Sequence, residues 1–133
     1  MSIFVDTSAL YAILDADDQN HERAKRLWVD LVTKKEHLVC HNYVLVETFA
    51  LVQHRLGLEA VRTLQEDVLP ILHVEWIDEA SHHAGVTAVL IAARRRLSLV
   101  DCVSFEVMRQ LGMKTAFAFD PHFAEQGFER IPE

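Results

Sequence analysis

Glycine, proline and cysteine are all scarce in this chain of 133 residues, which has 4 Gly, 3 Pro and 2 Cys. No stretch is rich in Gly, Pro or Ser, so we expect no flexible linker and no low-complexity segment. The two cysteines, Cys40 and Cys102, follow none of the spacings of zinc or dithiol redox motifs. They are therefore expected to be small core residues, as in proteins of the reducing cytosol.

Long apolar runs are also missing. No run approaches the roughly 18 apolar residues that a membrane-spanning helix needs. The N-terminus does not have the basic and then apolar pattern of a signal peptide, so we expect a cytoplasmic protein with no membrane contact.

Positively charged residues are fewer than negatively charged ones, because the chain has 13 Lys and Arg and 20 Asp and Glu, which gives a formal net charge of -7. This excludes a broad basic surface of the kind that nonspecific DNA-binding proteins use. It allows a nucleic-acid enzyme whose acids gather around metal ions and whose basic residues form a local patch.

What the chain does contain is an alternation of strand and helix patterns. Half of its residues are hydrophobic and its length is that of one domain, so residues 1–133 are expected to form a single core. Short apolar runs separated by helical segments predict the α/β class, with a parallel sheet and helices on both faces. The predicted strands are 2–6, 37–40, 71–77 and 114–119. The predicted helices are 8–14, 20–35, 41–57, 58–69, 79–96 and 98–112, with a short one after Pro121.

Two acidic residues directly follow predicted strands. Asp6 comes after "IFV", and Asp120 comes after "AFAF". In open α/β sheets, sites form beyond the carboxyl ends of the strands, so both carboxylates are candidates for one site. The structural alternative is helix capping, because Asp is a preferred N-cap residue and Pro121 suits the first turn. Capping and catalysis are compatible.

Glu47 lies inside the apolar helical segment "YVLVETFALV". Its neighbours at helical spacing are mostly apolar, so we expect its carboxylate to point inward. A buried and unpaired carboxylate destabilises a domain by several kcal/mol unless a cation compensates it. A salt bridge to a distant Arg is the structural alternative to a functional role.

Asp101 begins another apolar helix, in "SLVDCVSF". Ser98 and Asp101 have the spacing of a capping box, which is the local structural explanation. The residues that follow are apolar enough to bury this helix. We therefore expect its first turn to open on a cleft at the edge of the sheet.

Four acids that converge repel one another unless protonation or a cation relieves the repulsion. Carboxylate oxygens select hard cations such as Mg²⁺ or Mn²⁺, which keep open coordination positions. Those positions suit the hydrolysis of a phosphodiester bond. The predicted catalytic and metal-binding residues are Asp6, Glu47, Asp101 and Asp120.

Four segments of the chain, taken in order, resemble the PIN-domain ribonucleases, and most closely the small VapC-type toxins of toxin–antitoxin pairs. They are "FVDTSAL" at 4–10, "VLVETFALV" at 44–52, "LSLVDCVSFEVM" at 97–108 and "AFAFDPHF" at 116–123. The resemblance covers essentially the whole chain. It matches the same four acids to the family site, Thr7 or Ser8 to a hydroxyl that helps to order the site, and Ser98 to a hydroxyl three residues before the third acid.

The resemblance implies a PIN-like domain with a sheet of four or five parallel strands. It implies an endoribonuclease that uses Mg²⁺ or Mn²⁺ as its cofactor and RNA as its substrate. It also implies a homodimer and a small antitoxin protein that blocks the active site. Family members often cut structured RNA such as tRNA or rRNA loops.

The negative net charge requires that any attraction to RNA be local. Arg94, Arg95 and Arg96 come just before Ser98 and Asp101, so these arginines are candidate RNA contacts. The alternative is a solvated helix end, where basic residues are favourable.

Two further groups are weaker candidates. Arg23, Lys25 and Arg26 on the second predicted helix carry positive charge that RNA would attract. His122 follows Asp120 by two residues, and we expect it to be a surface histidine of the last helix rather than a substrate contact.

Other classes fit parts of the sequence. A haloacid-dehalogenase-like phosphatase also places an Asp at a strand end, but it needs a second Asp two positions later, where this chain has Ser8. A response-regulator receiver needs adjacent acids after its first strand, where this chain has Asp6 alone. A metal-binding module that holds RNA or a protein partner without cleavage remains open. Acid-to-amide variants that lose stability rather than activity would identify such a module.

Overall fold

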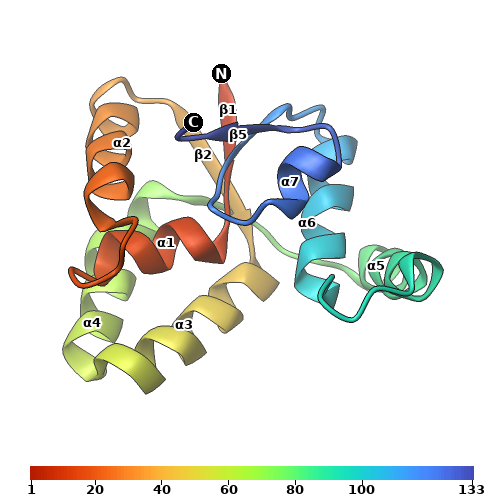
Figure 1. Cartoon of the computed structure of the whole chain (residues 1–133), viewed down its shortest axis with the longest axis horizontal. Coiled ribbons are helices and arrows are strands. Elements are labelled where there is room, and N and C mark those ends of the chain that lie inside the picture. Colours follow the sequence, from red (N-terminus) through yellow and green to blue (C-terminus); the bar gives the residue numbers. More distant parts are fainter.

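The computed structural model describes residues 1–133 and contains one parallel sheet of five strands in the order β3-β2-β1-β4-β5 (Figure 1). The central strand β1 pairs with β2 on one side and with β4 on the other, and every pairing is parallel. The predicted α/β class is confirmed. The strands are β1 (Ser2–Val5), β2 (His37–His41), β3 (His73–Glu75), β4 (Thr115–Phe117) and β5 (Glu129–Ile131).

The middle of the sheet is buried because its strands are short continuous apolar runs. Residues 3–5 of β1 and residues 116–117 of β4 have no exposed surface. Such runs are typical of parallel strands that are covered on both faces. Both cysteines are free and lie in this core, as predicted, and burial raises the pKa of Cys40 to about 12.

Two groups of helices flank the sheet. In Figure 1, α1 to α4 lie on one side of β1, and α5 to α7 lie on the other. Within these groups α1 packs against α2 and α3, and α5 packs against α6. None of the helices combines the length and the apolar character that a bilayer crossing requires. The helices are α1 (Thr7–Leu14), α2 (His21–Thr33), α3 (Asn42–Leu56), α4 (Leu58–Thr63), α5 (Glu79–Ala92), α6 (Leu99–Gln110) and α7 (His122–Glu125).

The helix predicted over 79–96 is too long. It ends at Ala92, because Ala93 takes a left-handed conformation with φ 52° and the chain then turns back to bury Leu97. Arg94–Arg96 therefore lie in the connection between α5 and α6 rather than at a helix end.

The third strand is shorter than predicted, and a fifth strand has no predicted counterpart. The strand expected over 71–77 covers only His73–Glu75, because Leu69–Ile71 form a 3-10 turn after a π-helical turn at Leu64–Val68. The fifth strand, β5, has three residues, of which two are charged, and it pairs with β4 at the edge of the sheet. Its conformation depends on that pairing rather than on an apolar pattern of its own.

The topology brings two loops together at one edge of the sheet. Because β1 and β4 are parallel neighbours, their carboxyl ends lie side by side. The backbone N–H of Asp6, just after β1, donates to the carbonyl of Phe117 at the end of β4 over 3.1 Å. This edge carries the predicted site.

Candidate metal centre

Asp6 is fixed where β1 passes into α1. Its Oδ2 accepts the backbone N–H of Ser8 at 3.1 Å and the Ser8 hydroxyl at 2.7 Å, so Asp6 caps α1 as predicted. Only 4% of its surface is exposed. Burial raises the pKa of Asp6 to about 7, against the hydrogen bonds from Ser8, and the charges of Asp101 and Asp120 act in the same direction as burial. Near neutral pH this carboxyl group favours a proton or a cation beside it.

Asp101 and Ser98 form the predicted capping box at the start of α6. The Asp101 N–H donates to Ser98 Oγ, and the Ser98 N–H donates to Asp101 Oδ2, both over 3.1 Å. Burial raises the pKa of Asp101, the Ser98 backbone N–H lowers it, and the charge of Asp120 raises it. The box uses one carboxylate oxygen, so the other stays available for a ligand.

The loop after β4 brings Asp120 and His122 against Asp101. Asp120 Oδ1 accepts the His122 N–H at 2.8 Å, whereas the N-cap position of the last helix is occupied by Pro121. His122 Nδ1 lies 3.1 Å from Asp120 Oδ1 and 3.8 Å from Asp101 Oδ2. One ligand atom from each of the three residues lies within 4.8 Å of the other two. We call Asp101, Asp120 and His122 the cluster.

His122 is not the surface histidine that we expected, since only 14% of its side chain is exposed. The reason is the anchoring of α7 by Phe123, which is fully buried. The Phe123 ring packs against Phe4 at 6.0 Å and Phe105 at 5.1 Å between ring centroids. This packing holds His122 towards α6. The sequence signal for it was its position two residues after Asp120.

The prediction that Glu47 points inward is wrong, because its side chain is exposed. The buried line of α3 runs through Val44, Thr48 and Val52, which are spaced by four residues, and Glu47 lies beside that line. With it, Ala50, Leu51 and His54 line an open hollow of ≈ 490 Å³.

Glu47 nevertheless belongs to the same electrostatic environment. Although the residue as a whole is exposed, desolvation of its carboxyl group by neighbouring atoms raises its pKa, the Thr7 hydroxyl lowers it, and the charges of Asp101 and Asp120 raise it again. The structure therefore places Asp101 and Asp120 in the cluster, with Asp6 and Glu47 near enough to feel their charge.

Two hydroxyl residues after Asp6 tie neighbouring elements to it. Ser8 Oγ accepts the backbone N–H of Phe119 at 2.9 Å while it donates to Asp6, so it joins the end of β1 to the loop after β4. The Thr7 hydroxyl donates to the carbonyl of Val44 at 3.4 Å, so it joins the start of α1 to α3. The predicted ordering hydroxyls thus connect three elements around the site.

The three arginines before α6 are exposed. Arg94 Nη1 pairs with Glu125 Oε2 of α7 at 3.1 Å, which places this connection beside the helix that begins with His122. Arg95 and Arg96 form no ion pair. They are therefore unpaired cations in the connection that leads to Ser98 and Asp101.

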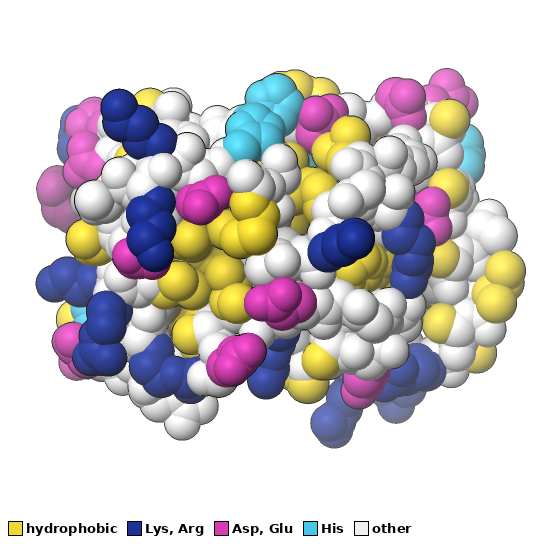
Figure 2. Space-filling model, turned by 90° about the horizontal axis from the view of Figure 1, so that it is seen from above, with side chains coloured by type: hydrophobic (Ala, Val, Ile, Leu, Met, Phe, Trp, Pro, Cys, Tyr) yellow, Lys and Arg dark blue, Asp and Glu magenta, His cyan; other side chains and the backbone are white.

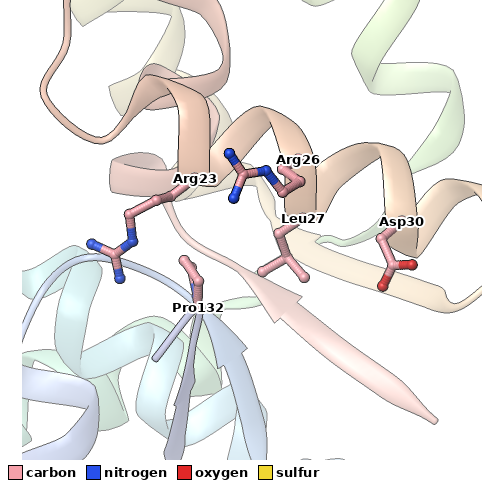
Figure 3. A pocket seen from close by; sticks show the side chains of 5 residues that line it. All are labelled: Arg23, Arg26, Leu27, Asp30 and Pro132. Atoms are coloured by element: carbon pink, nitrogen blue, oxygen red, sulfur yellow. The ribbon is translucent and has the colours of Figure 1, made fainter.

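The basic residues of α2 lie elsewhere. Arg23 and Arg26 line an open hollow of ≈ 470 Å³, and Figure 3 shows Arg23 and Arg26 projecting from one helix above Pro132. None of the four predicted acids lines this hollow, and Lys25 is exposed on the same helix. On the face seen in Figure 2, Lys and Arg side chains are interspersed with Asp and Glu, so that face is not uniformly basic.

The residues of the cluster fit a divalent metal ion. Two carboxylates and an imidazole nitrogen are close enough to share one ion, and His122 Nδ1 is buried without a hydrogen-bond partner. The raised pKa values of Asp6 and Asp101 reflect burial and mutual repulsion, both of which a bound cation relieves. An ion of this kind offers Lewis-acid chemistry to a phosphate ester.

Comparisons with known proteins show the family to which the chain belongs. Residues 3–129 match the PIN domain family. The 23S rRNA-specific endonuclease VapC20 of Mycobacterium tuberculosis is 35% identical over 130 residues, which are 97% of this chain and 97% of that protein. The VapC ribonuclease of Aquifex aeolicus is 22% identical over 127 residues, which are 96% of this chain and 93% of that protein.

Solved structures give the same result. The crystal structure of VapC20 of Mycobacterium tuberculosis, described as a sarcin–ricin loop cleaving toxin, has a TM-score of 0.84 at 34% identity and covers 95% of both chains. The structure of FitAcB from Neisseria gonorrhoeae has a TM-score of 0.69 at 15% identity, covers 98% of this chain and 96% of that one, and supports the fold alone.

Proposed function

Because this chain belongs to the PIN-domain family and is a VapC-type ribonuclease, we propose that it is a toxin that cleaves the sarcin–ricin loop of 23S rRNA. The resemblance that the sequence motifs indicate is confirmed by the family match. The observation that carries the proposal is the cluster beside the buried Asp6 in a chain that aligns over 97% of its length with a 23S rRNA-specific endonuclease.

In this proposal some site residues supply negative charge for a metal ion, and others hold those charged residues in position. Asp101 and Asp120 would hold a Mg²⁺ or Mn²⁺ ion, and Asp6 and Glu47 complete the negative field around that position. When bound, such an ion would supply Lewis-acid chemistry to the hydrolysis of the phosphodiester. Ser8 and Ser98 hold Asp6 and Asp101 in place before RNA arrives, so the acids need little rearrangement.

Arg95 and Arg96 are the proposed phosphate contacts. A net charge of -7 gives RNA no general attraction, so binding depends on cations next to the cluster. The ion pair of Arg94 with Glu125 fixes the connection between α5 and α6 beside α7 and so keeps its two free neighbours near the scissile region.

The proposed protein partners are an antitoxin and a second copy of this chain. The last turn of α5 supports a protein contact because two adjacent large apolar residues, Leu90 and Ile91, are 73% and 79% exposed there. We propose a cytoplasmic location, where both the ribosome and an antitoxin are present.

The test is to induce the protein in bacterial cells and to map new RNA 5′ ends across the transcriptome. Wild type is compared with Asp101→Asn, and Asp78→Asn serves as the matched control because Asp78 also caps a helix, at the exposed start of α5. We expect a discrete new end in the sarcin–ricin loop for wild type and Asp78→Asn, and at least about a 100-fold loss for Asp101→Asn.

Two outcomes would change the proposal. Discrete new 5′ ends in another RNA would support the ribonuclease activity and would identify a target other than the sarcin–ricin loop. Identical maps for wild type and folded Asp101→Asn, repeated on purified ribosomes with Mn²⁺, would contradict the nuclease and favour a metal-binding module.

A further inference from the structure

His122 Nδ1 is the one buried side-chain nitrogen or oxygen of the chain that has no hydrogen-bond partner. Buried polar atoms are nearly always paired, because an unpaired one loses about 1–3 kcal/mol of hydrogen bonding with water. The absence of a partner for His122 Nδ1 therefore requires an explanation, and the neighbouring carboxylate oxygens suggest one.

The nitrogen faces two carboxylates that are already engaged with backbone groups. Asp120 Oδ1 accepts the His122 N–H, and Asp101 Oδ2 accepts the Ser98 N–H. Although Nδ1 lies 3.1 Å from Asp120 Oδ1, the geometry there is not that of a hydrogen bond. The nitrogen thus lies within 4 Å of an oxygen from each carboxylate, close enough for all three to contact one cation.

The spacing of the three ligand atoms suits one ion. They lie within 4.8 Å of one another. Two ligands on opposite sides of an ion with bonds of about 2.0–2.2 Å are separated by about 4–4.5 Å. Small side-chain movements therefore bring all three atoms onto one ion.

We infer that His122 Nδ1 is a direct metal ligand with Asp101 and Asp120, and that this nitrogen makes the site prefer Mn²⁺ over Mg²⁺. This inference rests on the proposed function, because it concerns the metal of the same site. Imidazole nitrogen suits transition metals, whereas Mg²⁺ prefers oxygen ligands and keeps its waters. A site of carboxylates alone does not discriminate in this way.

The position of His122 is held by the fold. Phe123 next to it is fully buried between rings of β1 and α6, and Asp120 Oδ1 accepts the His122 backbone N–H. The imidazole is therefore oriented by packing before an ion binds, which is how ligand shells gain affinity.

The experiment is pulsed electron paramagnetic resonance of Mn²⁺ bound to the full chain. A nitrogen ligand couples its nuclear spin to the Mn²⁺ electrons, and ¹⁵N-labelled histidine changes that coupling in a recognisable way. We expect the histidine coupling in wild type and in the matched control His83→Ala, an exposed histidine of α5, and its loss in His122→Ala. Calorimetry should show about 10- to 100-fold weaker Mn²⁺ binding in His122→Ala and less than about threefold weaker Mg²⁺ binding.

The wild-type spectrum decides the matter even where a variant fails to fold. Mn²⁺ binding without histidine coupling overturns the inference and leaves the metal-dependent ribonuclease standing. Coupling that persists in folded His122→Ala assigns the nitrogen to another histidine and also overturns it. No Mn²⁺ binding at all contradicts both the inference and the proposed function. His122→Asp adds a selectivity test, since an oxygen ligand at this position should shift the preference towards Mg²⁺.

Discussion

The hydroxyl of Ser8 lies 2.7 Å from Asp6 Oδ2 and donates to it. Ser8 Oγ also accepts the backbone N–H of Phe119 at 2.9 Å, so one side chain joins the end of β1 to the loop after β4. The loop carries Asp120 to the cluster. This hydroxyl therefore adds a side-chain link between the first acid of the predicted set and the loop that carries the last one.

Replacing this hydroxyl, in Ser8→Ala, should lower the free energy of unfolding by about 1–2 kcal/mol. The variant loses a hydrogen bond to a carboxyl group and leaves the Phe119 N–H without its acceptor. It should also raise the pKa of Asp6 further, because the hydrogen bond from the Ser8 hydroxyl lowers it. Urea denaturation and carboxyl NMR titration measure the two effects. Ser2→Ala, at the half-buried start of β1, is the matched control; an equal loss in both variants would contradict the joining role.

Asp6→Asn should remove the pH dependence of stability that Asp6 imposes on the metal-free protein. The ordinary pKa of an Asp side chain is 3.8, and the fold raises the pKa of Asp6 to about 7. Between these values the folded state holds a proton that the unfolded state has lost, so stability falls as pH rises through this window. The full effect is on the order of 4 kcal/mol. In chelator at pH 8 we therefore expect Asp6→Asn to melt at a higher temperature than wild type.

The same comparison at acid pH provides the control. Near pH 4 Asp6 is protonated in the fold, so the amide and the acid should have melting temperatures that differ little. Because Asn also accepts a hydrogen bond, the cap of α1 is kept. A variant that is less stable than wild type by the same amount at both pH values would show that Asp6 serves as a cap and carries no unfavourable charge.

Much of the fold was predictable because its central strands are apolar runs. The strands at the middle of the sheet, β1, β2 and β4, lie where the sequence places them. The strand β5 was not predicted, because Glu129 and Arg130 carry no strand pattern and their extended conformation depends on pairing with β4. The end of α5 was not predicted, because the left-handed conformation of Ala93 follows from the turn that buries Leu97 and not from the Ala93 side chain.

The candidate site was predictable where it depends on strand ends and not where it depends on helix rotation. Asp6 and Asp120 follow adjacent parallel strands, so topology alone brings them to one edge. The side chain of Glu47 is exposed because the buried line of α3 passes one residue away, a rotation that its apolar neighbours do not reveal. His122 enters the cluster through the packing of Phe123, which no local pattern encodes.

Divalent metal should stabilise the folded protein, because it relieves repulsion that exists only when the acids are close. Mn²⁺ at 100 times its dissociation constant should add about 2.7 kcal/mol and raise the melting temperature by roughly 8 °C. Differential scanning fluorimetry with Mn²⁺, and then with excess chelator, measures the shift. Asp78→Asn should keep the shift, and Asp101→Asn should lose most of it. A shift of the same size in Asp101→Asn would place the ion elsewhere.

Replacing Arg95 and Arg96 together by Ala should weaken RNA cleavage without affecting the fold. Both side chains are exposed and unpaired, so their loss should change the melting temperature by less than about 2 °C. Each phosphate contact with single-stranded RNA contributes about 0.7 to the slope of log affinity against log salt. We therefore expect a salt slope lower by about 1.4 and a higher KM with little change in kcat.

The paired Arg62 on α4 is the control, since Arg62→Ala should leave both the salt slope and the KM unchanged. An unchanged salt slope in the double variant would show that these arginines are solvated and that RNA is held by other residues.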